Sequence, residues 1–169
     1  IGLYSQYDSE DMIGRKLQAL YLTGSSEEVL EFKNEHAHNA LVKLINSNEI
    51  TISGENIKRE YVYSIVNGLK FSAQFFDVPM AHFNINAGTR HDVDTISKEF
   101  LQLDLSSDEN VANAERAKAL HDLKEYFEKR LIELEVLKIY QDIDLKMIPV
   151  LALMEANGIT LNPNYLLEL

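Results

Sequence analysis

The sequence predicts an α/β domain with a mixed or parallel sheet, followed by a helical extension. In the first two thirds of the chain, short apolar runs that suit strands alternate with longer runs whose apolar residues recur at helical spacing. In the last third, only the helical spacing remains. The composition agrees, because 46% hydrophobic and 25% charged residues are typical of a globular chain. A length of 169 residues is enough for one sizeable core.

The first part of the chain predicts two strands, a helix and a third strand. Ser25 and Glu28 have the spacing of a capping box, so we expect a helix to open there and to continue to about Ile45. The Asn-Ser-Asn run that follows Ile45 suits the end of a helix. The expected strands are residues 1–6, 17–23 and 50–52.

The middle of the chain predicts a helix, a strand and another helix. Asn56 is a suitable N-cap for a helix that ends near Gly68. Residues 69–76 are apolar enough to form a strand, and Pro79 suits the first turn of the next helix.

The last third predicts two helices. Ser106 and Glu109 form a second capping box, and the long helix after it carries leucines and one phenylalanine on one face. In the second helix we expect Pro149 to cause a kink or a break, and Gly158 to mark the end. The apolar stripes of the two helices are Leu120, Leu123, Phe127, Leu131 and Leu134, then Ile139, Ile143, Met147, Val150 and Met154.

Charge and composition exclude some classes of function. The chain has no cysteine, so disulfides and thiolate metal sites are excluded. The formal net charge of −11 weighs against a protein that holds DNA by itself, since such proteins need a basic surface. No apolar run approaches the roughly 20 residues of a membrane span, so we expect no membrane association and a cytoplasmic location. Because Ile1 already lies in a strand-like run, we also expect the chain to be a piece of a longer protein.

Three stretches resemble bacterial family A DNA polymerases (DNA polymerase I). They occur in the family's order and at matching separations, with Asp77 in the matched interval. The resemblance implies a ribonuclease H-like mixed sheet flanked by helices, with a 3′–5′ exonuclease-like domain at residues 1–136 and the start of the polymerase domain at 137–169. The stretches are GENIK (54–58), RHDVDTI (90–96) and YQDIDLKMIPVLALMEANGITLNPNYLLEL (140–169).

The resemblance also implies where an exonuclease site would lie. Such a site cleaves a phosphodiester with two metal ions about 3.5–4 Å apart, held by carboxylates. The family's motifs are Asp-x-Glu on the first strand, Asn-x3-Asp at a helix start and Tyr-x3-Asp on the last helix. If residues 1–3 match the second strand, the first motif lies upstream. The others fall on Asn56 with Glu60, and on Val111 with Glu115.

These four positions predict a degenerate site without an intact catalytic residue. Both aspartates are replaced by longer glutamates, and Val111 cannot donate the hydrogen bond that orients water. We therefore expect no bound metal; in an active enzyme, Glu60 and Glu115 would be the ligands. The simpler interpretations are an N-cap for Asn56, solvated helix positions for Glu60 and Glu115, and a core contact for Val111.

The histidines are weaker candidates. His36 and His38 resemble a metal-binding pair, but residues two apart on a helix point in different directions. His82, His91 and His121 are scattered along the sequence, where surface or capping roles are expected.

The resulting hypothesis is a piece of a DNA-directed DNA polymerase that works in replication and repair. This piece would be a vestigial proofreading domain and a monomer, without a cofactor, that supports an intramolecular polymerase domain. The parent would use Mg²⁺ and contact DNA. One alternative is an active two-metal 3′–5′ exonuclease, which an Asp-x-Glu strand upstream would favour. The other is a non-catalytic nucleic-acid-binding module, which salt-dependent DNA binding would favour.

Overall fold

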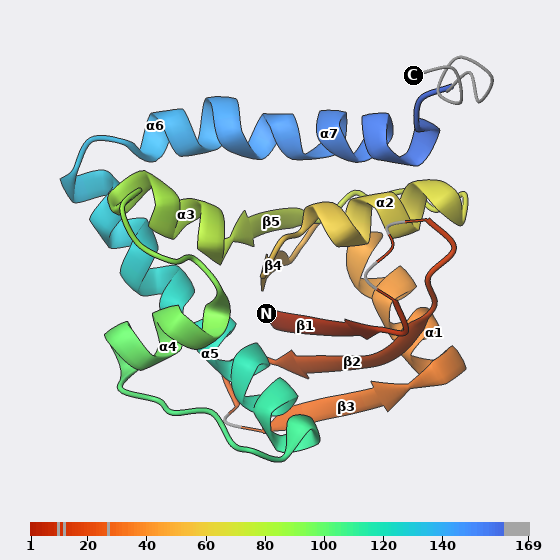
Figure 1. Ribbon diagram of the computed structural model, residues 1–169, viewed down its shortest axis with the longest axis horizontal. Helices are drawn as coiled ribbons and strands as arrows, with labels where there is room; N and C mark the ends of the chain where they lie inside the picture. The colour runs from red at the N-terminus through yellow and green to blue at the C-terminus, as the bar shows by residue number, and fades with distance from the viewer. Residues whose placement is uncertain (10, 12, 27, 161–169) are drawn as a thin grey trace, which may run out of the picture.

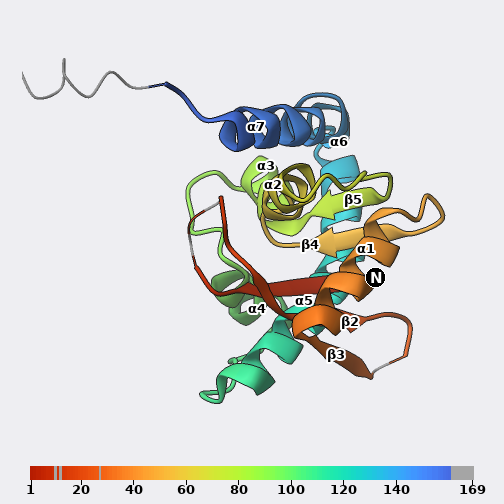
Figure 2. The same cartoon turned by 90° about the vertical axis from the view of Figure 1, so that its right-hand side faces the viewer.

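The computed structural model describes residues 1–160 except 10, 12 and 27. A five-stranded sheet has helices on both faces, and the C-terminal helices cross over one edge of it (Figures 1 and 2). Among the described residues, no helix is both long and apolar enough to cross a bilayer. The elements are β1 (Gly2–Tyr7), β2 (Leu17–Thr23), β3 (Val29–Lys33), α1 (Asn34–Ile45), β4 (Thr51–Gly54), α2 (Lys58–Val66), β5 (Gln74–Asp77), α3 (Val78–Ile85), α4 (Val93–Leu101), α5 (Glu109–Glu133), α6 (Leu137–Ile139), the π-helical turn η1 (Tyr140–Asp144) and α7 (Leu145–Asn157).

The sheet is mixed, as the sequence predicts. Its strand order is β3-β2-β1-β4-β5, and β2 runs antiparallel to both of its neighbours while β1, β4 and β5 are parallel. The match of residues 1–3 with the second strand is corrected here. Gly2 and Leu3 lie in the central strand β1, which pairs in parallel with β4, whereas the second strand, β2, is antiparallel to both of its neighbours.

The two faces of the sheet carry separate cores. Alternate residues of β2 point to opposite faces, so Leu20 and Leu22 pack towards α1 while Ala19 and Tyr21 pack towards α5. Gly2 lets α5 approach β1 closely, because a Cβ on Gly2 would lie 2.2 Å from the carbonyl oxygen of Ala117. The α5 stripe is buried as expected from Leu120 to Leu131, whereas Leu134 is exposed.

The capping box at Ser25 and Glu28 does not open a helix. Residues 29–33 form β3, which pairs with β2 along its whole length, and α1 begins only at Asn34. Cross-strand pairing has therefore overridden a local capping signal. The predicted end of the helix at Ile45 is confirmed.

Two other predicted caps are also wrong. Asn56 does not cap α2: it has a φ of 53°, and the side chain of Asp77 accepts the Ile57 N–H at 2.8 Å instead. The cap of α5 is Asp108, which accepts backbone N–H groups of the first turn, and Ser106 lies outside the helix. The predicted strand at 69–76 shortens to β5. The position of Pro79 in the first turn of α3 is confirmed.

Tyr140 anchors the C-terminal helices to the sheet. Its side chain is 1% exposed, and its hydroxyl both accepts the Asp77 N–H at 2.8 Å and donates to the Asp77 carbonyl at 3.1 Å. The ring packs against Phe76 with centroids 5.1 Å apart. Both partners lie at the end of β5, so this contact fixes where η1 leaves the sheet.

Helix α7 continues through Pro149, so the predicted break does not occur. The π turn η1 widens the backbone directly before α7, where the ring of Pro149 would otherwise crowd the preceding turn. The end of the helix at Asn157, followed by Gly158, is confirmed.

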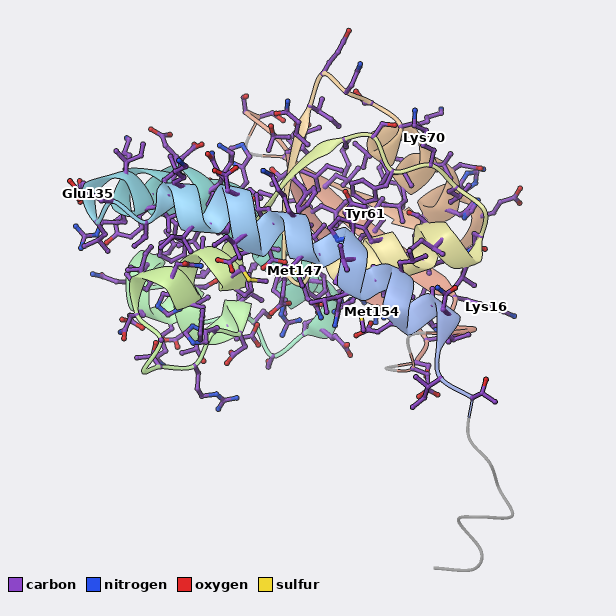
Figure 3. The ribbon with its side chains drawn as sticks, turned by 90° about the horizontal axis from the view of Figure 1, so that it is seen from above. Lys16, Tyr61, Lys70, Glu135, Met147 and Met154 are labelled. Atoms are coloured by element: carbon purple, nitrogen blue, oxygen red, sulfur yellow. The ribbon has the colours of Figure 1, made fainter. Side chains whose placement is uncertain are left out.

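The inward face of α7 differs from the predicted stripe. Tyr140, Ile148 and Ala152 are buried, and α7 packs along α2, to which Lys58 and Glu155 add an ion pair at 2.5 Å. The predicted stripe points outward, since its five residues are between 44% and 63% exposed. Figure 3 looks onto α7 from the side away from the sheet, with Met147 and Met154 labelled.

Replacing Tyr140 with Phe tests the anchor. The change keeps the ring but leaves the N–H and carbonyl of Asp77 buried without these partners, so we expect a loss of about 1–3 kcal/mol in the free energy of unfolding. Urea denaturation measures this. Tyr126→Phe is the control, because Tyr126 is 45% exposed and should change stability by less than about 0.5 kcal/mol. Equal effects of the two variants would contradict an anchoring role.

Candidate functional site

The candidate site surrounds β1 where α2 and α5 approach it. Tyr4 and Gln6 share one face of β1 and point towards α5, since the Asn113 amide lies 3.4 Å from the Gln6 side-chain oxygen. The guanidinium of Arg116, also on α5, lies 5.3 Å from the centre of the Tyr4 ring. No residue of β1 is an aspartate or a glutamate. This face of β1 therefore presents a phenol and an amide.

Glu60 is buried on the other side of β1. It is 2% exposed and accepts a hydrogen bond from the Tyr7 hydroxyl at 3.3 Å. Burial raises the pKa of Glu60, and the guanidinium of Arg59 opposes that effect. Its second oxygen is buried without a hydrogen-bond partner among the residues that the structure describes. The interpretation of Glu60 as a solvated helix residue is therefore wrong.

Two arginines enclose Tyr7 beside Glu60. The guanidinium of Arg15 lies 4.1 Å from the centre of the Tyr7 ring, and that of Arg59 lies 5.2 Å from it. Arg15 also donates to the Arg59 carbonyl at 2.8 Å, and Arg59 donates to the Ser5 carbonyl at 2.6 Å. The arginines thus bring positive charge to the buried carboxylate and connect α2 with β1.

Arg116 makes a similar connection on the α5 side. It forms a bidentate pair with Asp94, with both N···O distances at 2.8 Å, and it donates to the Asn113 side-chain oxygen at 2.7 Å. Asp94 belongs to α4, so one side chain joins α4, α5 and β1. The pKa of Arg116 is raised, first of all by its hydrogen bonds to Asp94.

The structure does not bring the four predicted site residues together. Asn56 lies in the turn before α2, and Glu115 accepts the Ser106 N–H at 2.8 Å, away from β1. Val111 is 48% exposed, so it is not a core contact either. Asn113, which sequence reasoning missed, is 1% exposed and faces β1 from α5. Only the three-dimensional register of α5 reveals it.

The residues around β1 do not fit a pair of divalent cations. Among the described residues, no group of three or more His, Cys, Asp or Glu side chains could hold a metal ion. Two of the nearby carboxylates already bind other groups, since Glu60 accepts from Tyr7 and Asp94 pairs with Arg116. Mg²⁺ and Mn²⁺ need several open oxygen ligands, which this arrangement does not offer.

The histidines lie elsewhere. Nδ1 of His38 is 2.7 Å from the Tyr63 hydroxyl, and that of His121 is 3.1 Å from Asp122. His82 is fully buried, and its Nδ1 is 3.0 Å from Nδ1 of His91. Burial lowers the pKa of His82, and the neighbouring His91 adds to the effect. The expectation of a surface position is therefore wrong for His82, and nothing in the sequence indicated its contact with His91.

Comparisons with known proteins find relatives in structure but not in sequence. No family model matches the chain, and no curated protein matches it. The POL domain of Pol1 from M. smegmatis, in complex with DNA primer-template and dNTP, aligns with a TM-score of 0.83 and 17% identity. That alignment covers 99% of this chain and 30% of the polymerase chain, so this chain spans about a third of its length.

Structures of a second protein are also similar. NrnC from Brucella melitensis with bound Mg²⁺ aligns with a TM-score of 0.78 and 18% identity, covering 92% of this chain and 84% of NrnC. The same protein bound to pGG aligns with a TM-score of 0.77. At these identities the likeness establishes the fold, which is ribonuclease H-like as predicted, with a mixed five-stranded sheet flanked by helices.

Replacing Glu60 with Gln tests the electrostatics of the site. Because the pKa of Glu60 is raised in the folded protein, its stabilising contribution is present below its ordinary value of 4.5 and is lost as the pH rises through the folded value. E60Q does not titrate. We therefore expect the stability of the unmodified protein, relative to E60Q, to fall as the pH rises above about 4.5.

Urea denaturation across this pH range measures the difference. Glu125→Gln is the control, because Lys129 lowers the pKa of the exposed Glu125. The stability of the unmodified protein relative to E125Q should therefore rise, not fall, as the pH rises. A parallel pH dependence in E60Q and the unmodified protein would contradict the burial of a titrating carboxylate.

Proposed function

We propose that this chain is the exonuclease-like part of a DNA polymerase of the DNA polymerase I type, and that it supports the polymerase domain without cleaving DNA. The observation that carries this proposal is the composition of the site around β1. Tyr4 and Gln6 occupy the face of the central strand where a two-metal nuclease of this fold would present carboxylates. Arg116 lies over Tyr4 from α5.

The chemistry of phosphodiester cleavage explains why these side chains suit a domain without nuclease activity. Two-metal hydrolysis needs one ion to activate water and a second to stabilise the leaving oxygen. Here Gln6 and Asn113 are amides, which carry no negative charge with which to hold the two ions. We propose Tyr4, Gln6, Glu60 and Asn113 as the degenerate positions, in place of Val111 and Glu115 on α5.

A supporting role agrees with the outward face of the C-terminal helices. Seven apolar side chains there are between 39% and 63% exposed, far more than a helix face in contact with water usually carries. We propose that the polymerase domain of the longer protein covers this face. Its residues are Ile139, Ile143, Met147, Val150, Leu151, Leu153 and Met154.

The turn between α5 and α6 suits the proposed domain boundary near residue 136. The link after it is not loose, because Tyr140 is anchored to Asp77 and Lys58 pairs with Glu155. A rigid link of this kind would hold the two domains in one orientation. The polymerase activity itself, with its Mg²⁺ and its DNA contacts, would belong to the rest of the longer protein.

The absence of nuclease activity is testable on this chain. Calorimetric titration with Mn²⁺ and incubation with an end-labelled single strand should give no two-site binding and no stepwise loss from the 3′ end. NrnC, a structural neighbour whose structure contains Mg²⁺, serves as the positive control for metal binding. Two-site binding together with 3′-end degradation would instead favour the active exonuclease, with the buried Glu60 as its first candidate ligand.

The supporting role has its own test. The double variant Val150→Asp, Met154→Asp changes two exposed side chains, so the stability of this chain should change by less than about 1 kcal/mol. In the longer protein, the same changes should lower polymerase activity or thermal stability, since they place charges in a buried interface. Lys138→Asp is the control. Unchanged behaviour of the longer protein would contradict the proposed interface.

A further inference from the structure

A hollow lies where the first turn of α1 meets the ends of two strands. Its volume is about 520 Å³, and it lies between the end of β1, the start of β2, the start of α1 and the last turns of α2. This volume falls in the range of small-ligand sites, roughly 300–1,000 Å³. We name it the α1 hollow; six of its lining residues are Asp8, Arg15, Lys16, Glu35, His38 and Tyr63.

The α1 helix begins in this hollow without a side-chain cap. Lys33, the residue before the helix, makes no side-chain hydrogen bond to the first turn, and Asn34 and Glu35 line the hollow. The helix is 12 residues long. The first N–H groups of a helix need an acceptor, and the helix dipole places about half a positive charge at that end. An anion in the hollow would satisfy both.

Arg15 supplies an independent observation. Its side chain is only 8% exposed although it lines the hollow, and its Nε is buried without a hydrogen-bond partner among the described atoms. One Nη donates to the Arg59 carbonyl. A buried guanidinium with part of its donor capacity unused is a binding group for phosphate or carboxylate.

The charges of the hollow favour an anion once the helix is included. Arg15 and Lys16 balance the carboxylates of Asp8 and Glu35 in formal charge. Asp8 is already engaged, because it accepts the backbone N–H of Lys16 at 2.7 Å. With the formal charges balanced, the N-terminal end of α1 adds a partial positive charge of about half a unit to the hollow. His38, held at 2.7 Å from the Tyr63 hydroxyl, adds a polar ring to the wall.

We propose that the α1 hollow binds a phosphate monoester. The three oxygens of the phosphate group would accept from the first turn of α1, from Arg15 and from Lys16. The hollow adjoins the site around β1 through Arg15 but takes its other walls from α1 and α2. This site does not depend on the proposed supporting role, since it requires neither metal nor a polymerase domain.

The test uses inorganic phosphate and a nucleoside 5′-monophosphate as probes. Nuclear magnetic resonance titration should shift the amide signals of residues 35–37, and calorimetry should give the affinity. Lys16→Glu should weaken binding of both probes about tenfold, because it reverses one charge beside the phosphate. Lys43→Glu, an equal charge change on an exposed residue in the last turn of α1, should change affinity by less than about twofold.

Each result decides the question. Binding that shifts the first-turn amide signals and is weakened by K16E but not by K43E supports the site. A higher affinity for the nucleoside monophosphate than for inorganic phosphate identifies the ester as the better ligand. Arg15→Lys, checked for folding by its circular dichroism spectrum, should also weaken binding. No binding of either probe, or equal weakening by K16E and K43E, would overturn the proposal.

Discussion

The fold depends on one buried carboxylate at the end of β5. Asp77 accepts the N–H of Ile57 at 2.8 Å and that of Met80 at 3.0 Å, so it caps the starts of α2 and α3 together. The Tyr140 hydroxyl bonds both backbone groups of the same residue. Burial raises the pKa of Asp77 to about 6, and the two N–H bonds oppose that shift. Three helical segments therefore take their position from a single residue.

This constraint explains the arrangement around β1. Since Asp77 holds the start of α2, Glu60 in the first turn of that helix is pressed against Tyr7 and loses its contact with water. A buried carboxylate is costly unless positive charge and hydrogen bonds compensate it. Metal ions would provide that charge in a nuclease of this fold; here the guanidinium groups of Arg15 and Arg59 lie beside it. Glu60 and the two arginines thus form one cluster of charges around Tyr7.

The sequence predicted the elements better than their contacts. Strand β2, the stripe of α5 and the stop at Gly158 follow from local periodicity and turn chemistry, which the structure retains. The failed caps at Ser25 and Asn56 have long-range causes: β3 is recruited by β2, and the cap of α2 comes from Asp77, 20 residues away. The site residues also depend on long-range contacts. Asn113 could not be predicted from the sequence because its position depends on how α5 lies across β1, and that arrangement leaves no local sequence signal.

The second helical stripe shows what helical periodicity alone does not predict. It correctly predicted an apolar face on α7, but a period of 3.6 does not say which of two faces is covered within the same chain. The face that packs on α2 uses Ile148 and Ala152, and the small side chain of Ala152 lets the helices approach, while the exposed stripe points outward. A contiguous exposed apolar face of this kind marks a surface for contact with another unit. In this molecule the anchored side of α7 and its open side are both apolar, which agrees with the proposed contact between this face and a polymerase domain.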